Sequence, residues 1–167
     1  MVVAWGRVIL GVMASERPIS KTMVVASTFS ASEDVCHEII PKLEERGFSK
    51  EDVFAVHLAL QEAFINAVRH GNGMDSGKAV RVEYSVDGER FVVSVADEGA
   101  GFDPESVPDP RCGENLYKPN GRGLLLMRSY MDVVEYNERG NEVRMVRYKH
   151  GSTEGQEQQI EREAGRG

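Results

Sequence analysis

Two polar side chains stand in the middle of the largely apolar segment HLALQEAFINAVRHGN, residues 57–72. Glu62 and Asn66 are four residues apart, so on a helix they are neighbours that point the same way. A carboxylate can take a proton from a hydroxyl group, and an amide oxygen can bind a hard cation such as Mg²⁺. The spacing alone fits an amphipathic helix with a solvated polar side equally well.

The residues around this pair favour a polar stripe between two apolar walls. At about 100° per residue, one broad apolar face contains Val53, Val56, Leu60, Ala63, Phe64 and Ala67. The narrower second face contains Glu62, Asn66, Arg69 and His70, with Leu58 and Ile65 on its other side. The pattern therefore places the stripe between apolar residues rather than on an open solvent face.

A second group of candidate residues lies in VADEGAGFD, residues 95–103. Asp97 ends an apolar strand, and Gly99 and Gly101 follow at alternate positions. Glycines let a backbone approach a ligand closely, and a carboxylate at a strand end is a fixed acceptor. Such an acceptor suits an exocyclic amine, for example that of adenine. In isolation the same residues also fit an ordinary Asp-Gly turn.

A third group lies in NGRGLLLM, residues 120–127, where Gly121 and Gly123 precede a run of helix formers. A glycine-rich entry to a helix presents free N–H groups and a positive dipole end to an anion. Arg122 can add a charge-assisted contact. The dinucleotide fingerprint G-x-G-x-x-G is excluded, because Leu126 stands where the third glycine is required.

Turn and capping residues, together with hydrophobic periodicity, predict the helices and strands that position these residues. We expect a strand at 22–29, helices at 30–47 and from Ser49 onward, strands at 79–86 and 90–97, a helix at 121–131, and strands at 132–137 and 142–149. The order β-α-α-β-β-loop-α-β-β predicts an α+β protein. It is a two-layer α/β sandwich with a mostly antiparallel sheet and helices on one face.

Capping residues mark both helix starts. Ser30 stands three residues before Glu33, and Ser49 three before Asp52, which predicts a side-chain cap at each site. Pro41 is expected to disturb the first helix.

The irregular segment between 98 and 120 is itself informative. Structureless connections beyond about 12–15 residues are uncommon inside a compact domain and are usually lids or disordered segments. Glycines at both roots favour a lid over a ligand; a tolerated surface insertion is the alternative.

Composition narrows the class of protein. The chain has 167 residues, a net charge of −7 and a pI of about 5.2, which argues against a nucleic-acid surface. It has no run of the roughly 20 apolar residues that a membrane helix needs. The two cysteines, Cys36 and Cys112, have no metal-type spacing and favour a reducing, cytoplasmic environment.

The two ends are expected to lie outside the domain. Residues 1–22 are apolar but interrupted by Arg7, so we interpret them as a poorly ordered extension or a start assigned too early rather than a signal peptide. Residues 150–167 are polar and predict a disordered tail. The domain is expected to cover 23–149.

In their order and spacing, EAFINAVRHGN, DEGAGFD and GRGLLLM resemble the N, G1 and G2 boxes of the GHKL ATPase superfamily. The first box looks most like that of the bacterial anti-sigma-factor serine kinases. The resemblance implies a Bergerat-type fold that binds Mg-ATP between helices and lid. It also implies a homodimer with a sigma factor and an anti-sigma-factor antagonist as partners.

The resemblance also assigns roles to the candidate residues. Glu62 would be the general base for a protein serine, Asn66 would hold Mg²⁺, and Asp97 would accept from the adenine amine. The residues that shape the pocket or lie against the phosphates would be Gly99, Gly101, Gly121, Arg122, Gly123 and Leu124. One departure concerns the last hairpin, where Asn141 and Glu142 follow the glycine that the family often follows with threonine.

Two other classes remain open. The chain could be the ATP-binding half of a histidine kinase, because CHEIIP places His37 before Glu38 and Pro41. The spacing is one residue short of the usual phosphoacceptor box, and there is no room for its dimerisation helices, so an exposed helix histidine is favoured. The other class is a nucleotide-binding regulator without phosphoryl transfer, against which the position of Glu62 argues.

Overall fold

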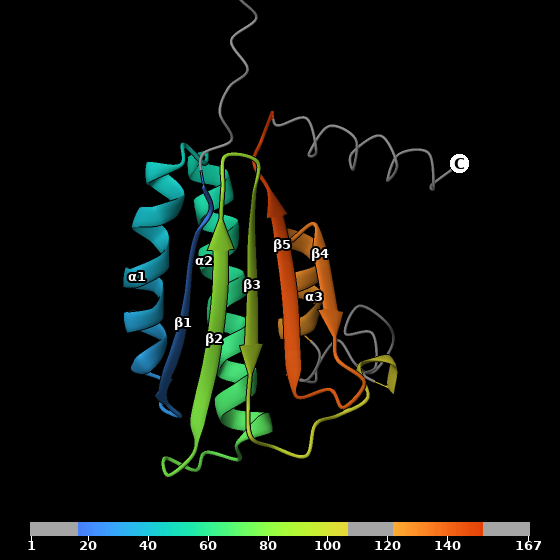
Figure 1. The fold of residues 1–167 in the computed structure, drawn as a ribbon. Helices are drawn as coiled ribbons and strands as arrows, with labels where there is room; N and C mark the ends of the chain where they lie inside the picture. The colour runs from blue at the N-terminus through green and yellow to red at the C-terminus, as the bar shows by residue number, and fades with distance from the viewer. Residues whose placement is uncertain (1–16, 107–121, 152–167) are drawn as a thin grey trace, which may run out of the picture.

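The computed structural model describes residues 17–106 and 122–151, in which three α-helices cover one face of a five-stranded sheet (Figure 1). The strands are β1 (Ile19–Ala26), β2 (Ala79–Val86), β3 (Arg90–Ala96), β4 (Val133–Tyr136) and β5 (Glu142–Tyr148). The helices are α1 (Ala31–Glu45), α2 (Lys50–Asn66) and α3 (Arg122–Tyr130). Strand order is β1-β2-β3-β5-β4, and all neighbouring pairs are antiparallel. The expected α+β sandwich is confirmed.

The pleat of β2 explains how the sheet forms its side of the core. Val80, Val82, Tyr84 and Val86 alternate with polar residues, and all four are buried. Their register with β3 pairs Val82 with Val95, which is also buried. Because alternate residues of a strand share one face, the sequence pattern is enough to decide which face the helices cover.

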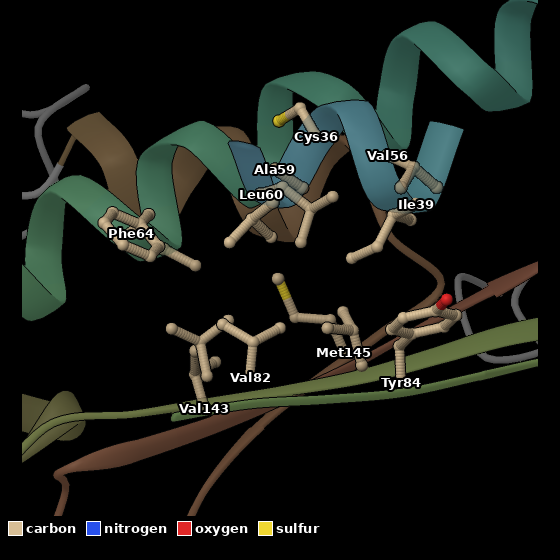
Figure 2. Packing of buried hydrophobic residues seen from close by; sticks show 14 of the residues in the cluster. Cys36, Ile39, Val56, Ala59, Leu60, Phe64, Val82, Tyr84, Val143 and Met145 are labelled. Carbon is tan, nitrogen blue, oxygen red and sulfur yellow. The ribbon is translucent and has the colours of Figure 1, made fainter. Parts of the chain in front are cut away.

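Helix α2 is the central helix of the layer. It packs against α1 on one side and α3 on the other, and its predicted apolar face lies on the sheet. Figure 2 shows Val56, Leu60 and Phe64 pointing at sheet residues that include Val82 and Met145. Burying one such side chain fully contributes about 1.5–3 kcal/mol. None of the helices in the described ranges has the length and apolarity that a bilayer span requires.

The two predicted caps have different outcomes. At α2 the capping box is confirmed: Ser49 Oγ accepts from the Asp52 N–H at 3.0 Å, and the Asp52 side chain accepts from the Ser49 N–H at 3.3 Å. At α1 the predicted cap is wrong, because Ser30 already has helical backbone angles (φ −63°, ψ −31°) and its side chain makes no capping bond. An extended N-cap backbone is what directs the oxygen at the free N–H groups. Pro41 lies inside α1, which continues to Glu45.

The end of the long helix departs from the predicted pattern. After Asn66 the helix widens into a π-helical turn, η1 (Ala67–Gly71), closed by a 2.7 Å bond from the Asn72 N–H to Ala67 O. Such single turns insert one extra residue and occur frequently at functional sites. Apolar periodicity predicts a helix here but does not distinguish this turn from a regular one.

Candidate functional site

A cavity of about 300 Å³ opens between α2, α3, the end of β3 and the β4–β5 hairpin. Pockets of this size hold small molecules. Five of the predicted site residues line it: Asn66, Asp97, Gly101, Gly123 and Leu124. The fold therefore brings together residues from three sequence segments that are far apart along the chain.

The start of α3 lies directly over the polar stripe of α2. A Cβ atom added to Gly123 would stand 2.7 Å from Glu62 Oε2 and 3.5 Å from both side-chain heteroatoms of Asn66. Any residue other than glycine would therefore displace the Glu62 carboxylate. Glu62 and Asn66 are both partly exposed. Asn66 lines the cavity, whereas Glu62 is not among its lining residues and lies against the N-terminal turn of α3.

Helix α3 begins at Arg122, which is exposed, and the N–H groups of its first turn have no acceptor within the helix, so they and the positive dipole end favour an anion. Leu124 is 8% exposed and contacts both the core and the cavity. Gly121 lies outside the described residues. The geometry places an anion-favouring helix end against a carboxylate and an amide, which suits a phosphate group and its metal.

Asp97 is held in a close glycine-lined turn. A Cβ atom on Gly71 would overlap the Asp97 carboxylate, and one on Gly99 would overlap the Gly71 carbonyl. Asp97 Oδ1 accepts a 2.7 Å hydrogen bond from the Gly99 N–H. The two glycines are required because the backbones of two segments approach here without room for a side chain.

Burial raises the pKa of the Asp97 carboxyl above its ordinary value, although the Gly99 N–H and the charges of Lys78 and Arg139 lower it in part. A carboxylate that is desolvated yet lines a cavity is a candidate functional group. It has acceptor capacity that a ligand donor can use.

The β4–β5 hairpin holds the same turn from the other side. Asn141 Nδ2 donates to Asp97 O at 2.9 Å, Asn141 O accepts from the Asp97 N–H at 2.9 Å, and Arg139 Nη2 donates to Gly99 O at 3.0 Å. Asn141 Oδ1 in turn accepts from Asn137 Nδ2 at 3.0 Å. The residue that departs from the family pattern thus bonds to the main chain of Asp97.

The cavity also has an aromatic wall that sequence reasoning missed. Phe102 and Tyr136 both line it, with their rings edge to face at 5.0 Å between centroids. Burial raises the pKa of Tyr136 to about 12. The position of Phe102, directly after the last glycine of DEGAG, could have marked it as a cavity residue. The sequence around Tyr136 gives no such indication, because its neighbours in the cavity come from a distant segment.

Asn72 is also a residue of this region that is not among the site residues predicted from the sequence. It closes the N-A-x-x-H-G-N motif, is 2% exposed, and its side chain bonds to three separate segments. His70 also lines the cavity, whereas His37 lies exposed on α1. The motif offered a signal for Asn72, but its partners lie 7 to 45 residues away in the sequence.

The fold is an α/β sandwich whose cavity lies between α2, α3, the end of β3 and the β4–β5 hairpin. Comparison with known proteins agrees. The model of the histidine kinase-like ATPase domain matches residues 26–147. A serine-protein kinase RsbW of Listeria monocytogenes is 34% identical over 110 residues, which cover 61% of this chain and 69% of that protein. The chain belongs to the histidine kinase-like ATPase family and, within it, to the anti-sigma-factor serine-protein kinases.

Two further proteins are similar, one in sequence and one in fold. An anti-sigma F factor of Clostridium perfringens is 29% identical over 137 residues, covering 70% of this chain and 95% of that protein. A crystal structure of the RsbU and RsbW domains of a Mycobacterium tuberculosis protein superposes with a TM-score of 0.55 at 18% identity. That match covers 80% of this chain but 34% of the larger one, and it supports the fold.

Proposed function

We propose that this chain is an ATP-dependent serine kinase of the cytoplasm that phosphorylates an antagonist protein in a partner-switching circuit and also binds a sigma factor. The observation that carries the proposal is the position of Glu62, with its carboxylate beside the N-terminal turn of α3. A module that only binds nucleotide has no need of a base at the point where the terminal phosphate would lie.

Each residue then has a defined task. Asp97 accepts from the adenine amine, and Gly71 and Gly99 let the two backbone segments beside its carboxylate pack without side chains between them. The first turn of α3 binds phosphate oxygens through its N–H groups. Glu62 accepts the proton of the attacking serine hydroxyl, a role that contributes about 10²- to 10⁴-fold to the rate of such steps.

The residues also fit Mg²⁺. Asn66 offers an amide oxygen next to Glu62, and the missing Cβ of Gly123 leaves a cradle there. Mg²⁺ is usually held by one or two protein ligands together with substrate phosphates, so the absence of a His/Cys/Asp/Glu cluster among the described residues does not count against it. When bound, the ion neutralises phosphate charge.

The partners in this proposal come from the family. The relatives are named serine-protein kinase and anti-sigma F factor, so we infer a sigma factor and an antagonist for this chain, and a homodimer as its working form. Neither a direct contact with nucleic acid nor a membrane contact is part of the proposal.

The test uses the full chain, Mg²⁺ and γ-labelled ATP with an antagonist-type protein encoded beside it. We expect label on one serine of that protein and none on a variant with that serine changed to alanine. Tight ATP binding without transfer to any such protein would contradict the kinase and favour the non-catalytic switch.

A further inference from the structure

Asn72 has no part in the function proposed above, yet its side chain is almost completely buried and fully used. Its Nδ2 donates to Ser27 Oγ at 3.0 Å and to Ala79 O at 2.9 Å, and its Oδ1 accepts from the Glu98 N–H at 2.8 Å. The amide therefore joins the end of β1 and the start of β2 to the residue that directly follows Asp97.

The π turn brings Asn72 to this place. Its main-chain N–H closes the turn on Ala67 O at 2.7 Å, a bond that spans five residues instead of four. The preceding residue, Gly71, is the one that lies against the Asp97 carboxylate. A single short segment, Gly71–Asn72, thus contacts both the carboxylate of Asp97 and the backbone after it.

Asp97 is held from two directions. The β4–β5 hairpin bonds to the main chain of Asp97 itself through Asn141, and Asn72 bonds to the next N–H along the chain. Between these two attachments the peptide after Asp97 cannot rotate without breaking a hydrogen bond. Its orientation decides whether the Gly99 N–H reaches Asp97 Oδ1 and where the free carboxylate oxygen lies.

We propose that Asn72 is a positioning residue for base recognition: through the Glu98 N–H it fixes the direction of the Asp97 carboxylate. The inference rests on the proposed function, in which that carboxylate accepts from the adenine amine. It predicts that Asn72 controls discrimination between nucleotides with and without the amine, beyond any effect on the stability of the fold.

The experiment measures Kd by calorimetry for ATP and for purine riboside triphosphate, which lacks the amine. We expect wild type to bind ATP about 10- to 100-fold more tightly, the usual effect of an unpaired buried polar group. Asn72→Ala should reduce that ratio to within about threefold. Ser27→Ala is the matched control, because it removes a partner of the same amide on the side away from Asp97, and should leave the ratio unchanged.

Each result has a distinct meaning. If Asn72→Ala weakens both nucleotides by the same factor, Asn72 is structural and the inference is overturned. If wild type already binds both equally, the adenine role of Asp97 fails first, and the role of Asn72 fails with it. Should Asn72→Ala not fold, Asn72→Asp keeps an oxygen for the Glu98 N–H and should retain the ratio; loss of the ratio in that folded variant would contradict the inference.

Discussion

At the N-terminal end of α2 the Asp52 carboxylate is 0% exposed, whereas the Glu62 carboxylate, further along the same helix, is partly exposed and faces the start of α3. Asp52 accepts from Arg147 Nη2 at 2.8 Å, from Ser49 Oγ at 2.9 Å and from the His150 main-chain N–H at 3.1 Å. Among the described residues, none forms a hydrogen bond or an ion pair with the Glu62 side chain. A carboxylate saturated with donors holds structure, and one left accessible is available for chemistry.

Asp52 on α2 and Asp97 in the cavity also differ in the direction of their pKa shifts. Burial raises the pKa of Asp52, but hydrogen bonds from the His150 main chain and Ser49, and the hydrogen bond and charge of Arg147, outweigh it, so the net shift is downward. At the cavity, burial of Asp97 is only partly offset and the pKa rises. The protein therefore supplies enough donors and positive charge to outweigh burial at Asp52, but not at Asp97.

The largest expected effect comes from Glu62→Gln, which keeps the size of the side chain but cannot take up a proton. Phosphate transfer should fall about 10²- to 10⁴-fold, with ATP affinity unchanged within a few-fold, which is a fall in kcat rather than in binding. Label transfer and calorimetry measure the two quantities. Equal phosphorylation by variant and wild type would show that Glu62 is not the base.

At the opposite end, Asp52→Asn should act on stability. Breaking a buried pair by removing one partner costs about 3–5 kcal/mol. The lower end is expected here, because the Arg147 guanidinium would lose its 2.8 Å partner but keep Asp132 at 3.8 Å and Tyr130 O at 3.1 Å. Urea unfolding gives the free energy. The matched control is Glu83→Gln, in an exposed pair with Arg81, where a change below about 1 kcal/mol is expected.

An Asp52→Asn variant as stable as the control would remove the contrast between the two ends of α2. The buried pair would then contribute nothing beyond what an exposed pair does.

A third variant, Asp97→Asn, should separate binding from stability within the cavity. It presents donors to the adenine amine, so ATP affinity should fall about 10- to 100-fold, while GTP affinity changes little. Because the raised pKa means that the ionised form is disfavoured in the folded state, the neutral variant should melt no lower than wild type. Equal wild-type affinity for ATP and GTP would refute the adenine assignment.

The smallest expected effect is on acid stability. The folded pKa of Asp52 is lowered, so its contribution is fully present above its unfolded pKa of about 3.9 and is lost as pH falls through the folded value. Urea unfolding below about pH 4 should therefore show a steeper loss for wild type than for Asp52→Asn. Parallel profiles for the two proteins would contradict the downward shift.

The sequence predicts local patterns well in this chain. The alternation of apolar and polar residues predicts the inward face of β2. The Ser49–Asp52 capping box is predicted from the spacing of its two residues. Both features depend only on residues that are close in the sequence. The stripe of Glu62 and Asn66 follows from helical spacing in the same way. The Ser30 cap fails because it depends on a backbone angle that composition does not reveal.

What the sequence leaves open are contacts across long separations. Arg147 lies 95 residues from Asp52, and Asn141 lies 44 residues from Asp97. Nothing in either local pattern names the other partner, so the buried ion pair and the second attachment of the Asp97 turn emerge only from the folded chain. The family resemblance supplied roles for the cavity residues and none for Asn72 or Tyr136.

The central claim is that the polar stripe of α2 faces a triphosphate whose base lies on Asp97. A crystal structure of the full chain with Mg²⁺ and a non-hydrolysable ATP analogue tests it most directly. We predict the adenine amine within hydrogen-bond distance of Asp97, the metal on Asn66, and the terminal phosphate at the N-terminal turn of α3 on the side of Glu62. A nucleotide bound elsewhere, for example in the groove beside Phe54 and Tyr130 at the other end of α2, would contradict it.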